Sequence, residues 1–262
     1  MNLITLQRSK VGGLPAIVSG HGRPIVLLHG VGLRAEAWSA QIEALCPDHH
    51  VVAPDIPGHG EAPRPAGPMV LRAYAGAMLP VLDSFEEPVL VVGHSMGALM
   101  ALELAALAPS KVCGIAALNA VFERSPTAAQ AVQLRAAQLD GVVPPDPTPT
   151  LDRWFGAGFS TERSACDAWL RAADPVGYKL AYTAFAHTSD PDRDALTRLK
   201  CPALFATGAL EPNSTPDMSH QMARLSPQGR SLIVEGAAHM MPMTHARDVT
   251  AAIRALASRV WS

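Results

Sequence analysis

Short apolar runs recur along the chain and are separated by stretches with helical spacing of apolar residues. The runs are rich in valine, leucine, isoleucine and alanine, as is typical of strands buried on both faces of a parallel sheet. They occupy 25–28, 50–54, 88–92, 112–118, 202–207 and 231–234. Helical segments are expected at 36–45, 70–85 (where Pro80 is expected to kink the helix), 98–107, 216–225 and 248–260. Segments 3–7 and 16–19 predict an opening antiparallel hairpin around Gly12-Gly13. The alternation predicts an α/β fold with a mostly parallel, eight-stranded sheet covered on both faces by helices.

The alternation stops between residues 122 and 195. Four candidate helices, at 126–139, 151–155, 161–172 and 175–187, follow one another without an intervening strand, and the proline-rich connector 141–149 is expected to be non-helical. Eight of the thirteen aromatic residues lie here, and we expect most of them to form the core of this insertion and a minority to face a substrate cleft: Phe122, Trp154, Phe155, Phe159, Trp169, Tyr178, Tyr182 and Phe185. We therefore divide the chain into an α/β core (1–121 and 196–262) and a helical cap (122–195) inserted after the sixth strand.

Composition and charge exclude several kinds of partner. Hydrophobic residues make up 48% and charged residues 17% of the chain, which supports a large buried core. The formal net charge of −2 gives no reason to expect nucleic acid or an anionic membrane surface, and no apolar stretch reaches the ~20 residues of a membrane span. The four cysteines are scattered, and no secretory signal opens the chain. We expect a cytoplasmic protein with a small-molecule substrate; the sequence allows a homodimer without indicating one.

The sequence Gly93-His94-Ser95-Met96-Gly97 joins a buried strand directly to a segment of strong helix formers. In this context Gly-x-Ser-x-Gly is typical of a sharp turn that lifts a nucleophilic serine above the sheet. The two glycines remove side chains that would clash with the strained backbone of the serine. An N-cap serine between two glycines is the alternative, but both flanks favour Ser95 as a nucleophile.

A serine nucleophile needs a general base, and His239 is our candidate. It follows the last predicted strand across Gly236-Ala237-Ala238, at the sheet edge where Ser95 lies and where catalytic groups collect in α/β sheets. Five other histidines are expected to make structural hydrogen bonds in glycine-rich turns (His29, His59 and His94) or to be exposed on helices (His220 and His245). The acid that orients the base should precede it in sequence, and Glu211 lies on the loop after strand 202–207. Asp217 is the alternative, although it fits a helix start better. A second position sometimes used for the acid, after strand 112–118, holds Asn119.

The oxyanion of an acyl-transfer intermediate needs preorganised donors. The amide of Met96 is one candidate, and the amide of Val31, in the glycine-rich loop after the strand 25–28, is the other. Arg34 could reach a substrate carboxylate, although a surface role is the simpler interpretation, and Trp154, Phe155 and Tyr182 are further candidates for substrate contact. The insertion carries seven basic and ten acidic residues and gives no bias toward anions. No metal-ligand cluster and no dinucleotide motif is present, so no metal and no cofactor is expected.

These motifs together make the chain resemble the α/β-hydrolase superfamily over essentially its full length. The matching segments are His29-Gly30-Val31-Gly32, Asp55-Ile56-Pro57-Gly58-His59-Gly60, Gly93-His94-Ser95-Met96-Gly97, Gly208-Ala209-Leu210-Glu211-Pro212 and Gly236-Ala237-Ala238-His239. Within the superfamily the chain is similar to a compact group with a four-helix cap, which includes 3-oxoadipate enol-lactonases, aminoacrylate hydrolases, carboxylesterases, cofactor-free haloperoxidases and meta-cleavage C–C hydrolases. Relatives usually carry aspartate where this chain has Glu211.

The resemblance implies a serine hydrolase that cleaves a small carboxylic ester or lactone through an acyl-enzyme on Ser95. Hydrolysis of a C–C bond or an amide by the same residues is the first alternative. A ligand-binding sensor that keeps the fold and turns over slowly is the second, and the unusual Glu211 is its only support.

Overall fold

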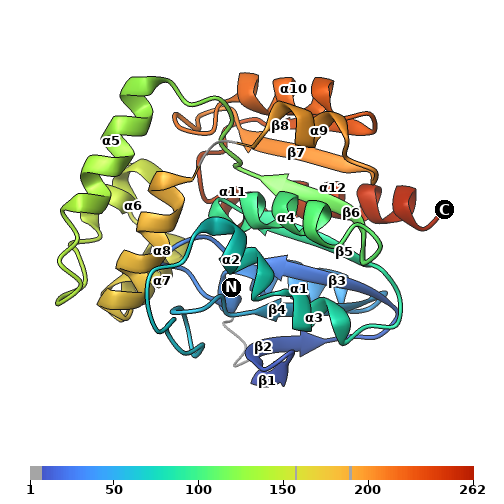
Figure 1. Cartoon of the computed structure of the whole chain (residues 1–262), viewed down its shortest axis with the longest axis horizontal. Coiled ribbons are helices and arrows are strands. Elements are labelled where there is room, and N and C mark those ends of the chain that lie inside the picture. Colours follow the sequence, from blue (N-terminus) through green and yellow to red (C-terminus); the bar gives the residue numbers. More distant parts are fainter. Residues whose placement is uncertain (1–7, 157, 189–190) are drawn as a thin grey trace.

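An eight-stranded sheet runs through the computed structural model, which describes residues 8–156, 158–188 and 191–262 (Figure 1). The strand order is β1-β2-β4-β3-β5-β6-β7-β8, with β1 and β2 antiparallel to their neighbours and all other pairs parallel. The strands are β1 (Arg8–Val11), β2 (Leu14–Ser19), β3 (Arg23–Leu28), β4 (His49–Pro54), β5 (Val89–His94), β6 (Val112–Leu118), β7 (Ala203–Gly208) and β8 (Gly229–Val234). The expected mostly parallel sheet of eight strands is confirmed.

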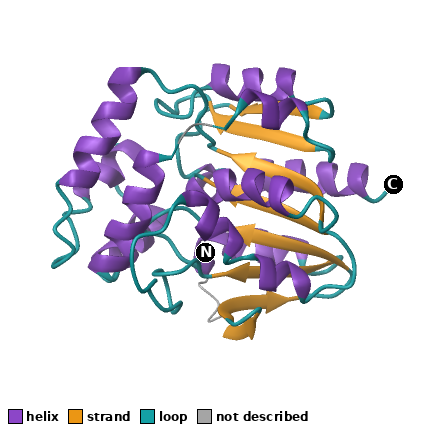
Figure 2. Cartoon of the chain, viewed as in Figure 1, coloured by secondary structure: helices purple, strands orange, loops and turns teal. Residues whose placement is uncertain are grey.

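Helices cover both faces of the sheet (Figure 2). One face is covered by α2 (Leu71–Gly76), α3 (Leu79–Asp83), α4 (Met96–Leu107) and α10 (Pro216–Leu225). The other face is covered by η1 (Ala35–Trp38), α1 (Ser39–Leu45), α11 (Met241–Thr244) and α12 (Ala246–Val260). None of the helices in the described part of the chain is long and apolar enough to cross a bilayer.

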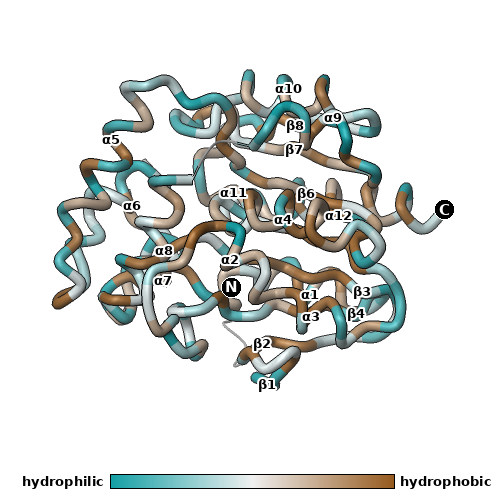
Figure 3. Tube along the Cα trace, in the orientation of Figure 1, coloured by the Kyte–Doolittle hydropathy of each residue, from teal (hydrophilic) through white to brown (hydrophobic). Residues whose placement is uncertain are grey.

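Alternation along the buried strands divides the core into two layers, and the strands carry much of the hydrophobic colour in Figure 3. In β3, Val26 and Leu28 pack into the cluster beneath α2, α3 and α4, whereas Ile25 and Leu27 pack beneath α1 and α12. Each strand therefore contributes to both layers, which explains why its sequence is apolar without a polar face.

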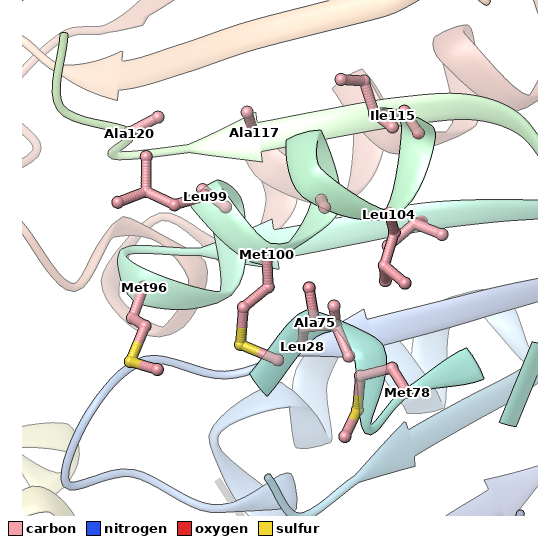
Figure 4. Packing of buried hydrophobic residues seen from close by; sticks show 14 of the residues in the cluster. Leu28, Ala75, Met78, Met96, Leu99, Met100, Leu104, Ile115, Ala117 and Ala120 are labelled. Atoms are coloured by element: carbon pink, nitrogen blue, oxygen red, sulfur yellow. The ribbon is translucent and has the colours of Figure 1, made fainter. Parts of the chain in front are cut away.

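Helix α4 is buried on nearly every side, because it packs on β5 and β6 and is itself covered by α2. Figure 4 shows Met100 of this helix next to Leu28 and Ala75, with Leu99 toward Ala120 and Met96 at the start of the helix. All these side chains are 2% exposed or less. The helix that follows the nucleophile candidate is thus fixed in position by the larger of the two core layers.

An insertion of four helices separates β6 from β7 and lies beyond the sheet edge toward which the parallel strands point (Figure 1). Its helices are α5 (Pro126–Ala137), α6 (Thr148–Phe155), α7 (Thr161–Arg171) and α8 (Pro175–His187). Three of them begin with a side-chain cap: Ser125 accepts from the Ala128 amide, Ser160 from the Arg163 amide, and Asp174 from the Gly177 amide. These caps satisfy amides that have no carbonyl partner within the helix, and they explain why the starts of these helices are easy to predict.

A hydrophobic cluster joins the insertion to the core. Leu33 and Ala37, just after β3, pack with Leu151, Cys166, Leu170 and Tyr178 of the insertion and with Met240 and Met243 beyond β8. The backbones also approach closely, since a Cβ on Gly177 would lie 2.4 Å from the carbonyl oxygen of Gly58. The insertion and the loops at the sheet edge therefore share one packed interface.

The structure differs from the sequence-based prediction in several local details. The helix expected at 70–85 is two helices, α2 and α3, because Pro80 lacks the amide that a continuous helix needs and instead lies in the first turn of α3. Helix α6 begins inside the connector expected to be non-helical, since first-turn amides are unpaired and Pro149 is tolerated there. The short helices α9 (Arg193–Thr197), which spans the predicted boundary at residue 195, and α11 were not anticipated. The hairpin turns at Gly12-Gly13, with Arg8–Val11 as its first strand; the expected strand 3–7 lies outside the described residues.

Candidate active site

Ser95 stands at the sharp turn between β5 and α4 in a strained conformation, with φ 57° and ψ −118°. The turn is possible only because its flanks lack side chains. A Cβ on Gly93 would lie 2.0 Å from the Gly97 carbonyl oxygen, and one on Gly97 would lie 2.2 Å from the Leu28 carbonyl oxygen. A serine held at positive φ at the end of a buried strand is a costly arrangement that indicates a functional site.

His239 and Glu211 meet at the same sheet edge, on the loops that follow β8 and β7. His239 Nδ1 and Glu211 Oε2 are 2.6 Å apart, and the carboxylate side chain is fully buried while the imidazole is 14% exposed. The additional methylene of glutamate is thus accommodated by the loop. Asp217 lies on the first turn of α10 instead, where it is exposed and accepts a hydrogen bond from Gln221.

The environment of Glu211 holds its carboxylate in the charged form. Burial alone would raise its pKa, but the charge and hydrogen bond of His239 and the amides of Asn213 and Ser214 lower the pKa to about 2. Glu211 Oε1 accepts from the Asn213 amide at 2.8 Å and from the Ser214 amide at 3.4 Å. The carboxylate is therefore both ionised and fixed in orientation.

Two polar side chains support this pair and were not assigned that role from the sequence. Asn119, which follows β6 with φ 54°, donates through Nδ2 to Thr207 Oγ1 at 3.1 Å and to Glu211 Oε2 at 3.4 Å. His94 donates from Nε2 to the His239 carbonyl oxygen at 2.8 Å, and burial lowers the pKa of His94 to about 3, so its ring is neutral. In the sequence, only the position of Asn119 at the carboxyl end of β6 indicates that its side chain can contact Glu211.

The loop after β3 brings a second backbone segment against Ser95. The Leu33 amide donates to the Gly30 carbonyl at 3.2 Å, forming a tight turn whose third residue, Gly32, has φ 77°. A Cβ on Gly30 would lie 3.5 Å from Ser95 Oγ, so the loop passes directly beside the hydroxyl. His29 fixes the loop from below, since its Nδ1 donates to the Gly30 carbonyl and its Nε2 accepts from the Ile56 amide. Val31 is the second residue of this turn, so its amide belongs to the loop beside Ser95.

A cavity of about 470 Å³ opens above Ser95 and His239. Val31, Trp154 and Tyr182, three of the residues expected at the site, also line it. Arg34 and Phe155 do not line it. Arg34 is paired with Glu36, at 2.7 Å between Nε and Oε2, and Glu36 is in turn bound by Arg8. Phe155 packs into the cluster that joins the insertion to the core. Neither residue therefore lines the cavity above Ser95, and their contact with substrate stays a prediction.

Aromatic side chains form much of the cavity wall. Four of the eight aromatic residues of the insertion line it, rather than the expected minority: Trp154, Tyr178, Tyr182 and Phe185. The ring of Trp154 stacks on His239 with centroids 5.5 Å apart. Phe159, by contrast, is 89% exposed.

Within the described residues no group of three or more histidine, cysteine or acidic side chains could hold a metal ion.

Comparisons with known proteins place this geometry in a family. The profile described as "Alpha/beta hydrolase family" matches residues 25–253. The (E)-2-((N-methylformamido)methylene)succinate hydrolase of Acinetobacter baylyi is 36% identical over 255 residues, which cover 96% of each chain. A pimeloyl-[acyl-carrier protein] methyl ester esterase of Xanthomonas oryzae pv. oryzae is 28% identical over 253 residues, covering 93% of this chain and 98% of the relative.

Solved structures agree in fold. A thermophilic esterase from Thermogutta terrifontis, determined with malate bound, superimposes with a TM-score of 0.87 at 25% identity and covers 98% of this chain and 100% of its own. An enol-lactonase from Burkholderia xenovorans LB400 superimposes with a TM-score of 0.81 at 23% identity, covering 96% and 100%. The profile match, the relatives and the fold agree, and the chain belongs to the α/β-hydrolase family.

Proposed function

We propose that this hydrolase cleaves a small carboxylic ester or lactone through an acyl-enzyme intermediate on Ser95. The observation that carries the proposal is the ionised Glu211 bound to His239 at 2.6 Å, beside a cavity that His239 and Ser95 both line. A charged, buried carboxylate has a clear role behind a histidine that must become positively charged during the reaction. The sensor hypothesis was motivated by the unusual glutamate, and the contact of Glu211 with His239 supports a catalytic role for that residue instead.

The hydrogen bond between His239 and Glu211 determines which histidine nitrogen can take the proton from Ser95. His239 Nδ1 donates to Glu211, which leaves Nε2 unprotonated and able to accept a proton from the Ser95 hydroxyl. Ser95 Oγ then attacks the substrate carbonyl carbon, the imidazolium is stabilised by the carboxylate, and Nε2 returns the proton to the leaving oxygen. Water, activated in the same way, hydrolyses the acyl-enzyme and releases the acid.

The oxyanion formed in each step would be held by the amides of Met96 and Val31. The Met96 amide is the first of helix α4, so it has no carbonyl partner within the helix and lies at the positive end of the helix dipole. The Val31 amide belongs to the tight turn beside Ser95 Oγ. Removing one such donor typically reduces kcat by ~10²–10³.

The helical insertion is proposed to act as a cap that covers the acyl group. Helices α5, α6 and α8 each contribute side chains to the cavity, including Val132, Trp154 and Tyr182. Such a cover excludes water from the site until the leaving group departs, and it allows the shape of the insertion to set substrate preference.

Amide hydrolysis is the second candidate, and the Acinetobacter relative favours it. Its name describes a succinate that carries a formamido-methylene group, and it is 36% identical to this chain. The same residues would serve, with His239 protonating a nitrogen instead of an oxygen. Parallel assays with an ester and an amide that share the same acyl group, and differ in whether oxygen or nitrogen leaves, would separate the two candidates by their kcat/KM values.

Labelling with an organophosphonate tests the nucleophile directly. We expect one adduct, located on Ser95 by peptide mass analysis, and loss of turnover in proportion to labelling. Ser95→Ala should take up no label and should lose ~10³-fold or more in kcat while keeping the thermal melting curve of the wild type. An adduct on another serine, or full activity in Ser95→Ala, would refute the assignment.

A further inference from the structure

Three arginines of the insertion region line the cavity above Ser95: Arg124, Arg135 and Arg153. The acidic residue that lines it with them, Glu123, is already paired with Arg193 at 2.5 Å. Glu211 is buried behind His239 and is held by its own donors. Arg135 and Arg153 therefore give one wall of the cavity a positive charge, although the insertion as a whole has more acidic than basic residues.

Arg135 and Arg153 differ from their neighbours in how their guanidinium groups are used. Within the insertion, Arg163 pairs with Asp152 at 2.6 Å and Arg171 pairs with Asp167 at 2.9 Å. Among the described residues, no carboxylate lies within 4.0 Å of Arg135 or Arg153. Two cations in a partly enclosed cavity without a protein counterion favour an anionic ligand.

Each of these two arginines donates one hydrogen bond to an uncharged oxygen. Arg135 Nε donates to the Tyr182 hydroxyl at 3.1 Å, and Arg153 Nη2 donates to Thr150 Oγ1 at 2.9 Å. Both contacts are to uncharged oxygens, so they do not neutralise either guanidinium. No described residue accepts a hydrogen bond from the two terminal nitrogens of Arg135, and a carboxylate matches that pair of donors.

We propose that the substrate carries a carboxylate at the end remote from the scissile carbonyl, and that Arg135 and Arg153 bind it. The inference rests on the proposed function, since it assigns one end of the substrate to Ser95 and the other to the arginines. The substrate class is thus a half-ester, a half-amide or a lactone of a dicarboxylic acid. The acyl-enzyme would keep the free carboxylate bound while water attacks.

The position of the arginines sets the direction of the bound chain. A second, smaller cavity of about 210 Å³ adjoins the first, and both are lined by Arg135, Arg153 and Tyr182. Ser95 and His239 line only the larger cavity. The arginines therefore stand at the side of the larger cavity that faces the smaller one, and a diacid would extend from Ser95 toward this junction.

Matched pairs of methyl esters test the proposal by replacing only the remote carboxylate with a methyl group. Monomethyl succinate, glutarate and adipate are compared with methyl butanoate, pentanoate and hexanoate, with acid release followed by a pH indicator. We expect kcat/KM to favour the anionic ester by ~10-fold or more for at least one chain length. Arg135→Met and Arg153→Met should each reduce that preference ~10-fold or more, and Arg135→Lys should reduce it less because the charge remains. Arg171→Met, outside the cavity, is the matched control and should leave the preference within twofold.

Calorimetric binding of succinate, glutarate and adipate gives a readout that needs no turnover. We expect at least one diacid to bind the wild type and Ser95→Ala alike, and to bind at least ~10-fold more weakly to Arg135→Met and Arg153→Met. Failure of all three diacids to bind, or equal losses for neutral and anionic esters, would overturn the carboxylate site. Full activity in Ser95→Ala together with intact diacid binding would instead refute the proposed nucleophile alone.

Discussion

Replacing Glu211 with glutamine tests how this site controls the histidine tautomer. Glu211 Oε1 accepts from the amides of Asn213 and Ser214, which only an oxygen can do. The glutamine oxygen must therefore occupy that side, and its NH2 group must face His239 Nδ1, where the carboxylate accepts a hydrogen bond at 2.6 Å. Asn119 can follow the change by rotating, since its Oδ1 has no hydrogen-bond partner among the described residues. The amide then donates to Nδ1, and the proton moves to Nε2, which is the wrong nitrogen for a base.

The size of the effect follows from two losses. The charge-assisted hydrogen bond to the imidazolium contributes ~1.5–3 kcal/mol. When the imidazolium forms in the variant, its Nδ1–H would face the glutamine NH2, and two donors facing one another in a buried site cost ~1–3 kcal/mol more. The sum of about 2.5–6 kcal/mol corresponds to a decrease of ~10²–10⁴-fold in kcat. Glu211→Asp keeps the charge but leaves a gap of ~1.5 Å, so we expect a smaller loss of ~10–100-fold.

The assay measures kcat on one ester for the wild type, Glu211→Gln, Glu211→Asp and Asp217→Asn, with melting curves to show that each variant is folded. Asp217→Asn is the matched control, since this exposed carboxylate lies on α10 and should leave kcat unchanged. A folded Glu211→Gln within tenfold of the wild type would refute the tautomer argument. A large loss in Asp217→Asn would mean that the acid has been assigned to the wrong residue.

Three further predictions concern stability and specificity. The pKa of Glu211 lies below its ordinary value, so the ionised carboxylate contributes about 3 kcal/mol to stability. This contribution should be complete above pH ~4.5 and lost as the pH falls toward 2. Urea unfolding of the wild type and Glu211→Gln should therefore show a smaller difference in unfolding free energy at pH 3 than at pH 7. Gly97→Ala should reduce the unfolding free energy by about 3 kcal/mol or more, because its Cβ would meet the Leu28 carbonyl, while Gly76→Ala, with open space around it, should change stability by no more than ~1 kcal/mol. Trp154→Leu should shift kcat/KM toward longer acyl chains by ~10-fold, since the indole lines the cavity; equal losses on all chain lengths together with a lower melting temperature would show a structural role only.

The fold was predictable because local signals and tertiary demands agree along most of the chain. Strand 112–118 and helices 175–187 and 216–225 have the predicted bounds, and each of the two helices begins with a capping side chain followed by proline. The predicted and observed helix bounds disagree where a proline can either start a helix or interrupt one. Pro80 and Pro149 each lie in the first turn of a helix instead of kinking or excluding one, and the sequence alone does not distinguish a first turn from an interior turn.

The candidate site was predictable as far as chain order and strand ends determine it. Ser95, His239 and Glu211 all follow strands, so the parallel sheet brings them to one edge. Substrate contacts depend instead on the directions of side chains in a helical insertion with no such rule. Arg34 was considered for an anion site because of its position near Val31, yet its nearest partner in sequence, Glu36, binds it. Net charge also concealed the arginines of the cavity, because acidic residues elsewhere on the insertion balance the total without neutralising the site.

The hydrophobic cluster shared by the insertion and the core limits how this protein can be recombined with its relatives. Leu170 and Tyr178 come within 3 Å of where a Cβ of Gly32 would lie, so the loop that presents Val31 fits one particular insertion. A chimaera that exchanges only the four helices would bring foreign side chains against that loop and against Met240, the neighbour of His239. Specificity in this molecule is therefore expected to change through correlated substitutions on both sides of the interface, and engineering by transplanting the insertion should succeed only when the loop after β3 is transferred with it.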